Sequence, residues 1–160
     1  MILIALGANL PSPAGPPATT LRAALARLEQ QGVKIQSVSS FYETPAWPDP
    51  GQPAYVNAVA AVETTLQPVE LLTVLHGVET DFGRLRSAPN ASRALDLDLL
   101  DHGGKVMTGG VTLPHPRMTE RSFVLVPLAE IAPDFIFPDQ QKKVSELLSS
   151  LTSDEILQKM

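Results

Sequence analysis

The sequence predicts an α+β fold in which helices pack on a mainly antiparallel sheet, and two observations support this. Short apolar or alternating segments, typical of strands, are interleaved with segments whose apolar residues recur at helical spacing. Their order is strand, helix, strand, strand, helix, strand, the βαββαβ pattern of a ferredoxin-like sandwich. The 160 residues suit one hydrophobic core and no internal repeat is evident, so we expect a single domain over 1–160.

Three strands and one helix are expected in the first 64 residues. "MILIALG" (1–7) is an apolar run closed by a glycine, and 19–31 has helical spacing with either threonine of the 19–20 pair as N-cap. The stretch 33–44 is rich in β-branched and aromatic residues, which favours a strand. The next strand, 54–64, places Tyr55 and Asn57 on one face and on the other Val56, Ala58, Ala60 and Val62.

The second half of the chain should contain a further strand and three helices. A helix is expected from Pro68, which a first helical turn accepts, to Gly83, which suits the C′ position. Its apolar stripe comprises Leu71, Leu72, Leu75, Val78 and Phe82. A strand over 93–100, a hairpin turn over 102–105, a short helix within 123–133 and an amphipathic helix at 144–151 follow.

Composition and charge exclude several classes of function. The formal net charge of −5 argues against nucleic-acid binding that depends on overall basicity. The absence of cysteine excludes disulfides, thiolate zinc sites and cysteine nucleophiles. The apolar start is too short to span a bilayer and no basic leader precedes it, so we expect a cytoplasmic protein without a membrane partner. Ten of the fifteen prolines lie in expected loops at 11–17, 44–53 and 113–116.

The strand "RALDLDLL" carries two acids in an apolar stretch. Its leucines share one face, while Asp96 and Asp98 share the other, about 6.6 Å apart along the strand. Such a pair can hold one or both of two metal ions that lie about 3.5–4 Å apart on a substrate. Hard oxygen ligands favour Mg²⁺, which usually shares phosphate oxygens with the protein. The alternative is that the outward face of this strand is simply polar.

Basic residues are concentrated on both sides of this acid pair. The chain has only 12 Lys and Arg, yet five arginines flank the strand: Arg84, Arg86, Arg93, Arg117 and Arg121. His115 lies in the "LPHP" loop between the strand and the last two. Guanidinium groups bind phosphate oxygens bidentately, so arginines beside paired carboxylates suit polyphosphate chemistry. The alternative is that the arginines pair with surface acids. No G-x-x-x-x-G-K-[ST] loop is present, which excludes a P-loop enzyme.

The stretch "ETPAWPDPGQPAYVN" (43–57) indicates a second candidate site. Trp47, Tyr55 and Phe123 are three of only eight aromatic residues, and Asn57 can offer a donor and an acceptor to the edge of a heterocycle. Flat aromatic ligands are commonly held by stacking and a few polar contacts. The alternative is that Tyr55 and Phe123 belong to the core and Trp47 anchors the loop, and the residues alone leave both readings open.

Several stretches stand in one order and with a spacing that is typical of a known family: "ALGANL" (5–10), "SSFYETPAW" (39–47), "GQPAYVNAV" (51–59), "E-x-x-x-GRLR" (79–86), "SRALDLDLL" (92–100), "LPHPRMTERSFVLVPLAEIAP" (113–133) and "FPD" (137–139). Together they resemble the 6-hydroxymethyl-7,8-dihydropterin pyrophosphokinase family of folate biosynthesis. The resemblance covers all but about the last twenty residues. It implies a ferredoxin-like fold and transfer of pyrophosphate from ATP to the hydroxymethyl group of the dihydropterin, with release of AMP.

The resemblance also implies roles for single residues. Two Mg²⁺ ions would be held by Asp96 and Asp98, which with Arg84 and Arg93 would form the catalytic set. ATP would contact a larger group, namely Arg84, Arg93, Thr112, His115, Arg117 and Arg121. The pterin pocket would comprise Thr44, Pro45, Trp47, Tyr55, Asn57 and Phe123, with Glu79 close by. Small-molecule substrates would then be the only partners, and we expect a monomer.

One stretch departs from the family pattern. Many members have an Arg-Trp-Gly-Pro-Arg type of stretch before the acid pair, whereas this chain has "PNASR" (89–93), with Asn90 at the tryptophan position. The departure supports an alternative, a catalytically silent domain that binds a pterin or a nucleotide. A third hypothesis, an RNA-binding ferredoxin-like module, is disfavoured by the net charge and by the absence of the aromatic RNA-binding strand motif.

Overall fold

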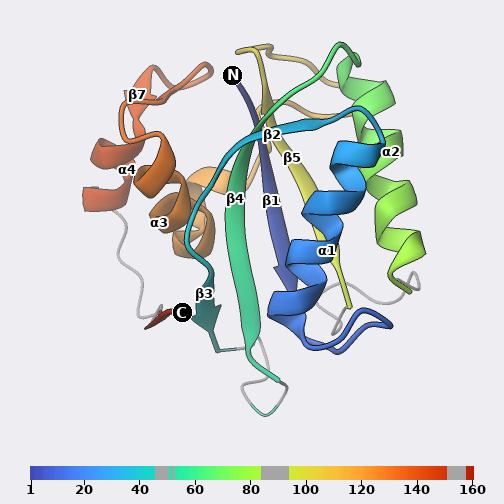
Figure 1. Cartoon of the computed structure of the whole chain (residues 1–160). Helices are drawn as coiled ribbons and strands as arrows, with labels where there is room; N and C mark the ends of the chain where they lie inside the picture. The colour runs from blue at the N-terminus through green and yellow to red at the C-terminus, as the bar shows by residue number, and fades with distance from the viewer. Residues whose placement is uncertain (46–50, 52, 84–93, 151–157) are drawn as a thin grey trace.

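A computed structural model describes residues 1–45, 51, 53–83, 94–150 and 158–160, and its main sheet has six strands (Figure 1). A two-stranded hairpin and several helices complete the described part of the chain. In chain order the elements are β1 (Ile2–Ala8), α1 (Pro17–Gln30), β2 (Lys34–Val38), β3 (Tyr42–Thr44), β4 (Tyr55–Glu63), α2 (Pro68–Asp81), β5 (Asp96–His102), the 3₁₀ turn η1 (Met118–Glu120), α3 (Ser122–Ile131), β6 (Ile136–Phe137), β7 (Lys142–Lys143), α4 (Val144–Ser150) and β8 (Gln158–Lys159).

The order of the strands confirms the predicted ferredoxin-like sheet. The path is β5-β1-β4-β3-β8, and β2 pairs with another part of β4. Every pairing in this sheet is antiparallel. The central strands are therefore β1 and β4, with β5 on one side and β2 and β3 on the other, as the βαββαβ pattern requires.

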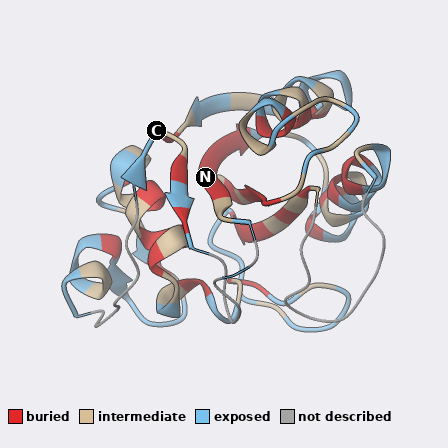
Figure 2. Cartoon of the chain, turned by 90° about the horizontal axis from the view of Figure 1, so that it is seen from below, coloured by how far each residue is buried: buried red, intermediate tan, exposed pale blue. Residues whose placement is uncertain are grey.

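The sheet separates two hydrophobic cores, one on each face (Figures 1 and 2). The helices α1 and α2 cover one face and bury Leu21, Leu28, Leu71 and Leu75 against it. On the opposite face α3 and α4 bury a smaller cluster that comprises Leu3, Val59, Leu100, Met118, Val124, Leu125, Leu128, Phe137 and Val144. On this second face, described residues of β1, β4 and β5 line a cleft together with the first turn of α3.

The side chains of β5 alternate as the sequence predicts. Leu97 and Leu99 join the core under α1 and α2, whereas Asp96 and Asp98 line a cleft on the α3 side. The register against β1 shifts between Leu3 and Ile4, which indicates a bulge near the end of β5. The alternation therefore holds over the acid pair, where it sets the direction of both carboxylates.

One expected strand is two strands in the structure. The prediction of a continuous strand over 33–44 is wrong, because β2 ends at Val38 and β3 begins at Tyr42. At the break, the hydroxyl of Ser39 accepts a hydrogen bond from Val59 N–H at 3.0 Å, while the Ser39 N–H donates to the Val59 carbonyl at 2.9 Å. A side chain thus replaces one backbone bond of the ladder, so the chain is free to change direction.

Two details of the expected caps and turns are also corrected. The residue at the N-cap of α1 is Pro16, and Thr20 is buried inside the helix with its hydroxyl donating to the Pro16 carbonyl. The turn after β5 is present, with Gly103 and Gly104 at positive φ, but within the described residues it leads only to an isolated bridge between Met107 and Leu113. A regular hairpin is therefore absent from this segment.

The other predicted helices are confirmed. Pro68 occupies the first turn of α2, and Gly83 follows that helix at a φ of +88°. The expected helix within 123–133 corresponds to α3, which begins one residue earlier at Ser122, and the helix expected at 144–151 corresponds to α4, described to Ser150. The turn η1, the β6–β7 hairpin and β8 carry no clear signal in the sequence. Among the helices in the described residues, none combines the length and the apolar character that a membrane span needs.

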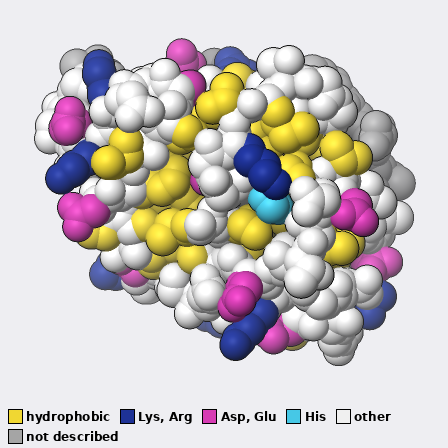
Figure 3. Space-filling model, turned by 90° about the horizontal axis from the view of Figure 1, so that it is seen from above, with side chains coloured by type: hydrophobic (Ala, Val, Ile, Leu, Met, Phe, Trp, Pro, Cys, Tyr) yellow, Lys and Arg dark blue, Asp and Glu magenta, His cyan; other side chains and the backbone are white. Residues whose placement is uncertain are grey.

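The two ends of the sheet differ in character. Figure 3 shows the end where β1 begins, and there hydrophobic side chains spread across the middle of the surface among scattered charges. Met1, Val106 and Ile136 are largely exposed. Figure 2 faces the opposite end of the sheet, where β1 ends and the antiparallel β5 begins with Asp96 opposite Gly7.

Candidate functional site

The floor of a cleft is formed by one row of residues that crosses the sheet. In the register of the strands, Asp96 on β5 faces Gly7 on β1, Gly7 faces Asn57 on β4, and Asn57 faces Tyr42 on β3. Residues directly opposite one another in a sheet share a face. Because Gly7 has no side chain, a gap separates the carboxylate from the amide, and this gap opens toward α3.

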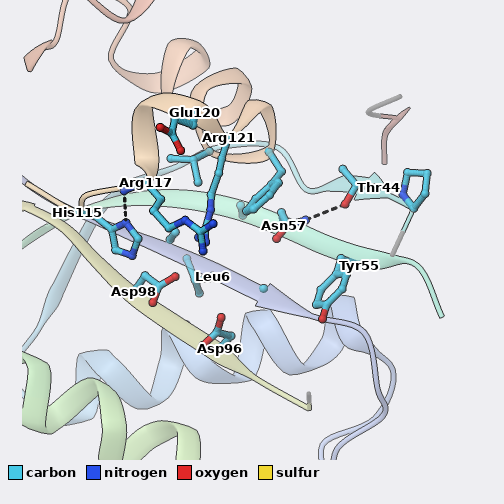
Figure 4. A pocket seen from close by; sticks show the side chains of 16 residues that line it. Leu6, Thr44, Tyr55, Asn57, Asp96, Asp98, His115, Arg117, Glu120 and Arg121 are labelled. Carbon is cyan, nitrogen blue, oxygen red and sulfur yellow. Dashed lines mark hydrogen bonds between the residues drawn. The ribbon is translucent and has the colours of Figure 1, made fainter. Parts of the chain in front are cut away.

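The cleft above this row has a volume of about 440 Å³ (Figure 4). Its walls come from β1, β4, β5, the end of β3, and the segment that runs from the loop at 115 into the first turn of α3. The lining residues are Ala5, Leu6, Gly7, Thr44, Pro45, Tyr55, Asn57, Ala58, Asp96, Asp98, His115, Arg117, Glu120, Arg121, Phe123 and Val124.

The acidic side of the cleft consists of Asp96 and Asp98, both half-buried. No group of three or more His, Cys, Asp or Glu in the described residues could hold a metal ion by itself. Two carboxylates on one face still fit Mg²⁺, since this ion is usually bound by one or two carboxylates and completes its shell with water and phosphate oxygens. The donor set thus suits a divalent cation that arrives with a phosphate ligand.

Glu79 supports this acidic strand from behind. Its carboxylate comes from α2, is only 2% exposed, and accepts a hydrogen bond from the Leu97 N–H at 2.8 Å. Leu97 stands between Asp96 and Asp98, on a strand that forms the edge of the sheet. The buried carboxylate therefore satisfies a backbone N–H that would otherwise lack a strand partner. It also holds the backbone between Asp96 and Asp98 in place.

The basic side of the cleft consists of His115, Arg117 and Arg121. The backbone N–H of His115 donates to the Leu100 carbonyl at 2.9 Å, which ties this loop to β5. The imidazole Nδ1 of His115 accepts from the backbone N–H of Arg117 at 3.2 Å. Burial and then the charge of Arg121 lower the pKa of His115, against the opposing effect of Asp96. Within the described residues neither arginine forms an ion pair, so both guanidinium groups are available to an anion in the cleft.

The opposite end of the cleft forms a slot with an aromatic wall. Phe123, in the first turn of α3, has the Arg121 guanidinium 5.4 Å from its ring centroid. Across the slot, the Asn57 Nδ2 donates to the Thr44 hydroxyl at 3.1 Å, which holds the amide in one orientation (Figure 4). A Cβ on Gly7 would lie 2.9 Å from the Asn57 Oδ1, closer than real contacts allow. The glycine thus makes room for the amide that faces the slot.

The cleft brings together ten of the residues singled out in the sequence: Thr44, Pro45, Tyr55, Asn57, Asp96, Asp98, His115, Arg117, Arg121 and Phe123. Thr112 is exposed on the preceding loop and does not line it. Trp47, Arg84, Arg86, Asn90 and Arg93 lie outside the described residues. Sequence reasoning did not single out Glu120 at the rim or the functional reason for Gly7, although a glycine opposite a polar strand residue is a signal that could have indicated the second.

The arrangement can hold two kinds of group side by side. Carboxylates suit a divalent cation, and the histidine and arginines that face them suit the phosphates that such a cation carries. The adjoining slot combines an aromatic face, an anchored amide and a hydroxyl, which suits a flat polar ring. A polyphosphate and a flat ring bound at these two places would lie side by side, which suits the transfer of a phosphoryl group to a substituent of the ring.

Comparison with known proteins agrees with this geometry. The sequence profile of the family described as 7,8-dihydro-6-hydroxymethylpterin-pyrophosphokinase (HPPK) matches residues 3–133. A protein of Synechocystis sp., named 2-amino-4-hydroxy-6-hydroxymethyldihydropteridine pyrophosphokinase, is 38% identical over 151 residues, which are 93% of this chain and 75% of that protein. A Haemophilus influenzae protein of the same name is also 38% identical, over 96% of this chain and 94% of its own length.

Solved structures support the fold. Wild-type HPPK-DHPS of Plasmodium falciparum with STZ-DHP aligns with a TM-score of 0.74 at 13% identity. The alignment covers 92% of this chain and 42% of that chain, so the present protein spans less than half the length of this solved relative. At this identity the likeness concerns the α+β fold alone.

Proposed function

Since the chain belongs to the 7,8-dihydro-6-hydroxymethylpterin-pyrophosphokinase family, it is an ATP-dependent diphosphotransferase of folate biosynthesis, and we propose that the cleft described above is its active site. The reaction transfers pyrophosphate from ATP to 6-hydroxymethyl-7,8-dihydropterin and gives the pterin diphosphate and AMP. The observation that supports the assignment is the row Asp96–Gly7–Asn57, in which a carboxylate and an amide that could pair with a heterocycle lie on either side of a glycine.

The acceptor is proposed to lie in the slot between Phe123 and Asn57. A pterin is flat, and the rim of its pyrimidine ring carries both donors and acceptors, so the anchored amide of Asn57 can pair with that rim. Phe123 offers a ring face for stacking, and Tyr55 and Thr44 complete the wall. Trp47 is proposed to belong to the same pocket on the strength of the family resemblance.

The nucleotide is proposed to lie along the acidic and basic sides of the cleft. Asp96 and Asp98 would hold two Mg²⁺ ions, which when bound would neutralise the triphosphate and make its β-phosphorus more electrophilic. His115, Arg117 and Arg121 face the carboxylates across the cleft and would bind phosphate oxygens. The family resemblance adds Arg84, Arg93 and Thr112 to this set.

Catalysis would then rest on positioning and charge neutralisation. The hydroxymethyl oxygen would attack the β-phosphorus, the bond to the α-phosphate oxygen would break, and AMP would leave with that oxygen. None of the described cleft residues is an obvious strong general base for the hydroxyl. The proton of the hydroxyl would therefore pass to solvent or to a phosphate oxygen. Arginines fixed on a rigid loop can stabilise the negative charge that develops without moving.

The whole chain, 1–160, is proposed to act as one domain, as a monomer in the cytoplasm, with its small-molecule substrates as partners. Gel filtration with light scattering would test the monomer, since a dimer would elute at twice the 17.1 kDa mass.

The decisive test of the function is release of AMP. The protein should form AMP from ATP and Mg²⁺ only when 6-hydroxymethyl-7,8-dihydropterin is present, at one AMP per pterin diphosphate. Calorimetric binding of pterin and nucleotide without AMP would instead support the silent-domain alternative, and ATP cleavage independent of the pterin would contradict the proposed site.

A further inference from the structure

A carboxylate outside the cleft joins the two walls of the pterin slot. Glu130, near the C-terminal end of α3, accepts a hydrogen bond from the Tyr42 hydroxyl at 2.6 Å. It also accepts bonds from the Ser40 N–H at 2.7 Å and from the Ser40 hydroxyl at 3.0 Å. The Lys159 ammonium of β8 lies 3.9 Å from the same carboxylate. The Glu130 side chain of α3 therefore contacts both the start of β3 and its neighbour β8.

The elements that Glu130 joins are those that carry the slot. Phe123 stands seven residues before Glu130, about 10 Å along the same helix, and forms one wall. Thr44, two residues after Tyr42 on β3, belongs to the other wall. Because helix and strand are both stiff over these short lengths, a tie at one end sets their separation at the other.

Tyr42 transmits this tie directly to the amide that reads the ligand. It stands opposite Asn57 in the sheet, so the two side chains are neighbours on the α3 face. Asn57 in turn donates to Thr44 on the same strand as Tyr42. A displacement of β3 away from α3 would therefore move both Tyr42, the neighbour of Asn57, and Thr44, which accepts the hydrogen bond of Asn57.

The contacts themselves are strong ones. Bonds to a carboxylate are roughly twice as strong as those between neutral groups, and the 2.6 Å separation from Tyr42 falls in the range typical of such bonds. Burial by itself would raise the pKa of Glu130, yet the bonds from Tyr42 and Ser40 outweigh it and the pKa is lowered. The carboxylate is therefore charged at neutral pH, when the tie is strongest.

We propose that Glu130 is a positioning residue that fixes the width of the pterin slot by holding β3 against α3 through Tyr42 and Ser40. This inference rests on the proposed function, and it assigns to Glu130 an effect on the acceptor rather than on ATP. The nucleotide side of the cleft is carried by β5 and the 115–121 segment, whereas the hydrogen bonds that Glu130 accepts come from Tyr42 and Ser40.

The test compares variants of the tie with a matched control. Glu130→Ala removes the tie, Tyr42→Phe removes one hydroxyl but keeps the ring beside Asn57, and Glu130→Gln keeps an oxygen that can accept only part of the bonds. The control is Glu29→Ala, because Glu29 ties α1 to β2 in the same way, by accepting from the Ile35 N–H at 2.9 Å, but lies on the other face of the sheet.

Each variant is titrated with 6-hydroxymethyl-7,8-dihydropterin in the presence of Mg²⁺ and a non-hydrolysable ATP analogue, and the KM for both substrates and kcat are measured. Glu130→Ala should raise the Kd and KM for the pterin about tenfold, the loss expected when about one hydrogen bond to the ring is no longer made, with the KM for ATP within about twofold. Tyr42→Phe should give a smaller rise in the same direction, and Glu130→Gln should restore part of the loss.

Glu29→Ala should lower the melting temperature and leave both substrate constants unchanged. The proposal is overturned if Glu130→Ala lowers only the melting temperature, if it shifts the constants for ATP and pterin equally, or if Glu29→Ala changes pterin binding as much. A wild-type protein that forms no AMP would contradict the proposed function, but the direct titration of the pterin would still decide the role of Glu130.

Discussion

Replacing Gly7 with alanine should weaken pterin binding without unfolding the protein, because the added methyl group collides with Asn57. An ideal Cβ at this position would lie 2.9 Å from the Asn57 Oδ1, which is 0.5 Å short of the 3.4 Å at which ordinary contact begins. The φ of Gly7 is not positive, so the backbone itself accepts alanine. The conflict therefore concerns the side chain of Asn57 alone.

The size of the effect follows from how Asn57 is held. Asn57 as a whole residue is 8% exposed and its Nδ2 donates to the Thr44 hydroxyl at 3.1 Å, so the amide can turn away only by breaking that bond. Each hydrogen bond that the displaced amide no longer makes to the pterin is worth about 0.5–1.5 kcal/mol. Two such bonds amount to about 1–3 kcal/mol, or roughly a five- to 150-fold rise in the Kd.

Stability should change little, because the roughly 0.5–1 kcal/mol that alanine gains over glycine in a strand offsets the loss of the hydrogen bond between Asn57 and Thr44. Titration with the dihydropterin, with Mg²⁺ and an inert ATP analogue present, gives the Kd, and a thermal melt reports the fold. The matched control is Gly77→Ala, in the middle of α2, where a Cβ meets nothing within 4 Å. This control should leave the Kd unchanged.

In an Asn57→Ala background the effect of Gly7→Ala should largely vanish, since no amide remains to be displaced. The reasoning would be refuted by a Gly7→Ala variant that binds the pterin as tightly as the wild type and melts at the same temperature. It would equally be refuted by a loss of affinity that persists in full when Asn57 is absent.

Three further predictions concern the acid pair and the tie between α3 and β3. Asp98→Asn should lower turnover about a hundredfold or more with little change in melting temperature, and near-normal AMP release at saturating Mg²⁺ would contradict the metal role. Glu79→Ala should cost about 1–3 kcal/mol in chemical denaturation, because the buried Leu97 N–H loses its acceptor, and should raise the Mg²⁺ concentration that activity requires. An unchanged Mg²⁺ dependence would show that Glu79 does not set the acid pair. Burial raises the pKa of Tyr42 from 10.0 to about 12, with smaller contributions from the hydrogen bond to Glu130 and from the charge of Glu130. This contribution to the free energy of unfolding is complete below pH 10 and is lost as the pH rises through about 12, so Tyr42→Phe should remove that part of the alkaline loss of stability.

The fold and the acidic side of the cleft could be predicted because each depends on local pattern. The alternation in "RALDLDLL" fixes which side chains of β5 share a face, and it does so without reference to any other strand. Likewise Pro68 and Gly83 mark the limits of α2 by their own backbone preferences. These features needed no knowledge of what packs against them.

The features that could not be predicted depend on contacts between distant parts of the chain. The break between β2 and β3 follows from bonds of Ser39 to β4 and of Ser40 to α3, residues that lie 20 and 90 positions away. The row from Asp96 through Gly7 to Asn57 exists only in the register of three strands. The pairing of β8 with β3 is similarly non-local, and two residues are too few to give a periodic signal.

The sheet divides the interior into two hydrophobic cores, and the amino-acid sequences of these two cores are under different constraints. No residue of α1 or α2 in the described structure lines the cleft, although the Glu79 carboxylate accepts a hydrogen bond from the backbone of the strand that carries the acid pair. Lineages adapting to hotter or colder habitats can therefore repack Leu21, Leu28, Leu71 and their neighbours with little effect on which molecules are bound. Substitutions that weaken the binding of a pterin-like inhibitor are instead expected among the residues that line the cleft, where each one also affects the substrate.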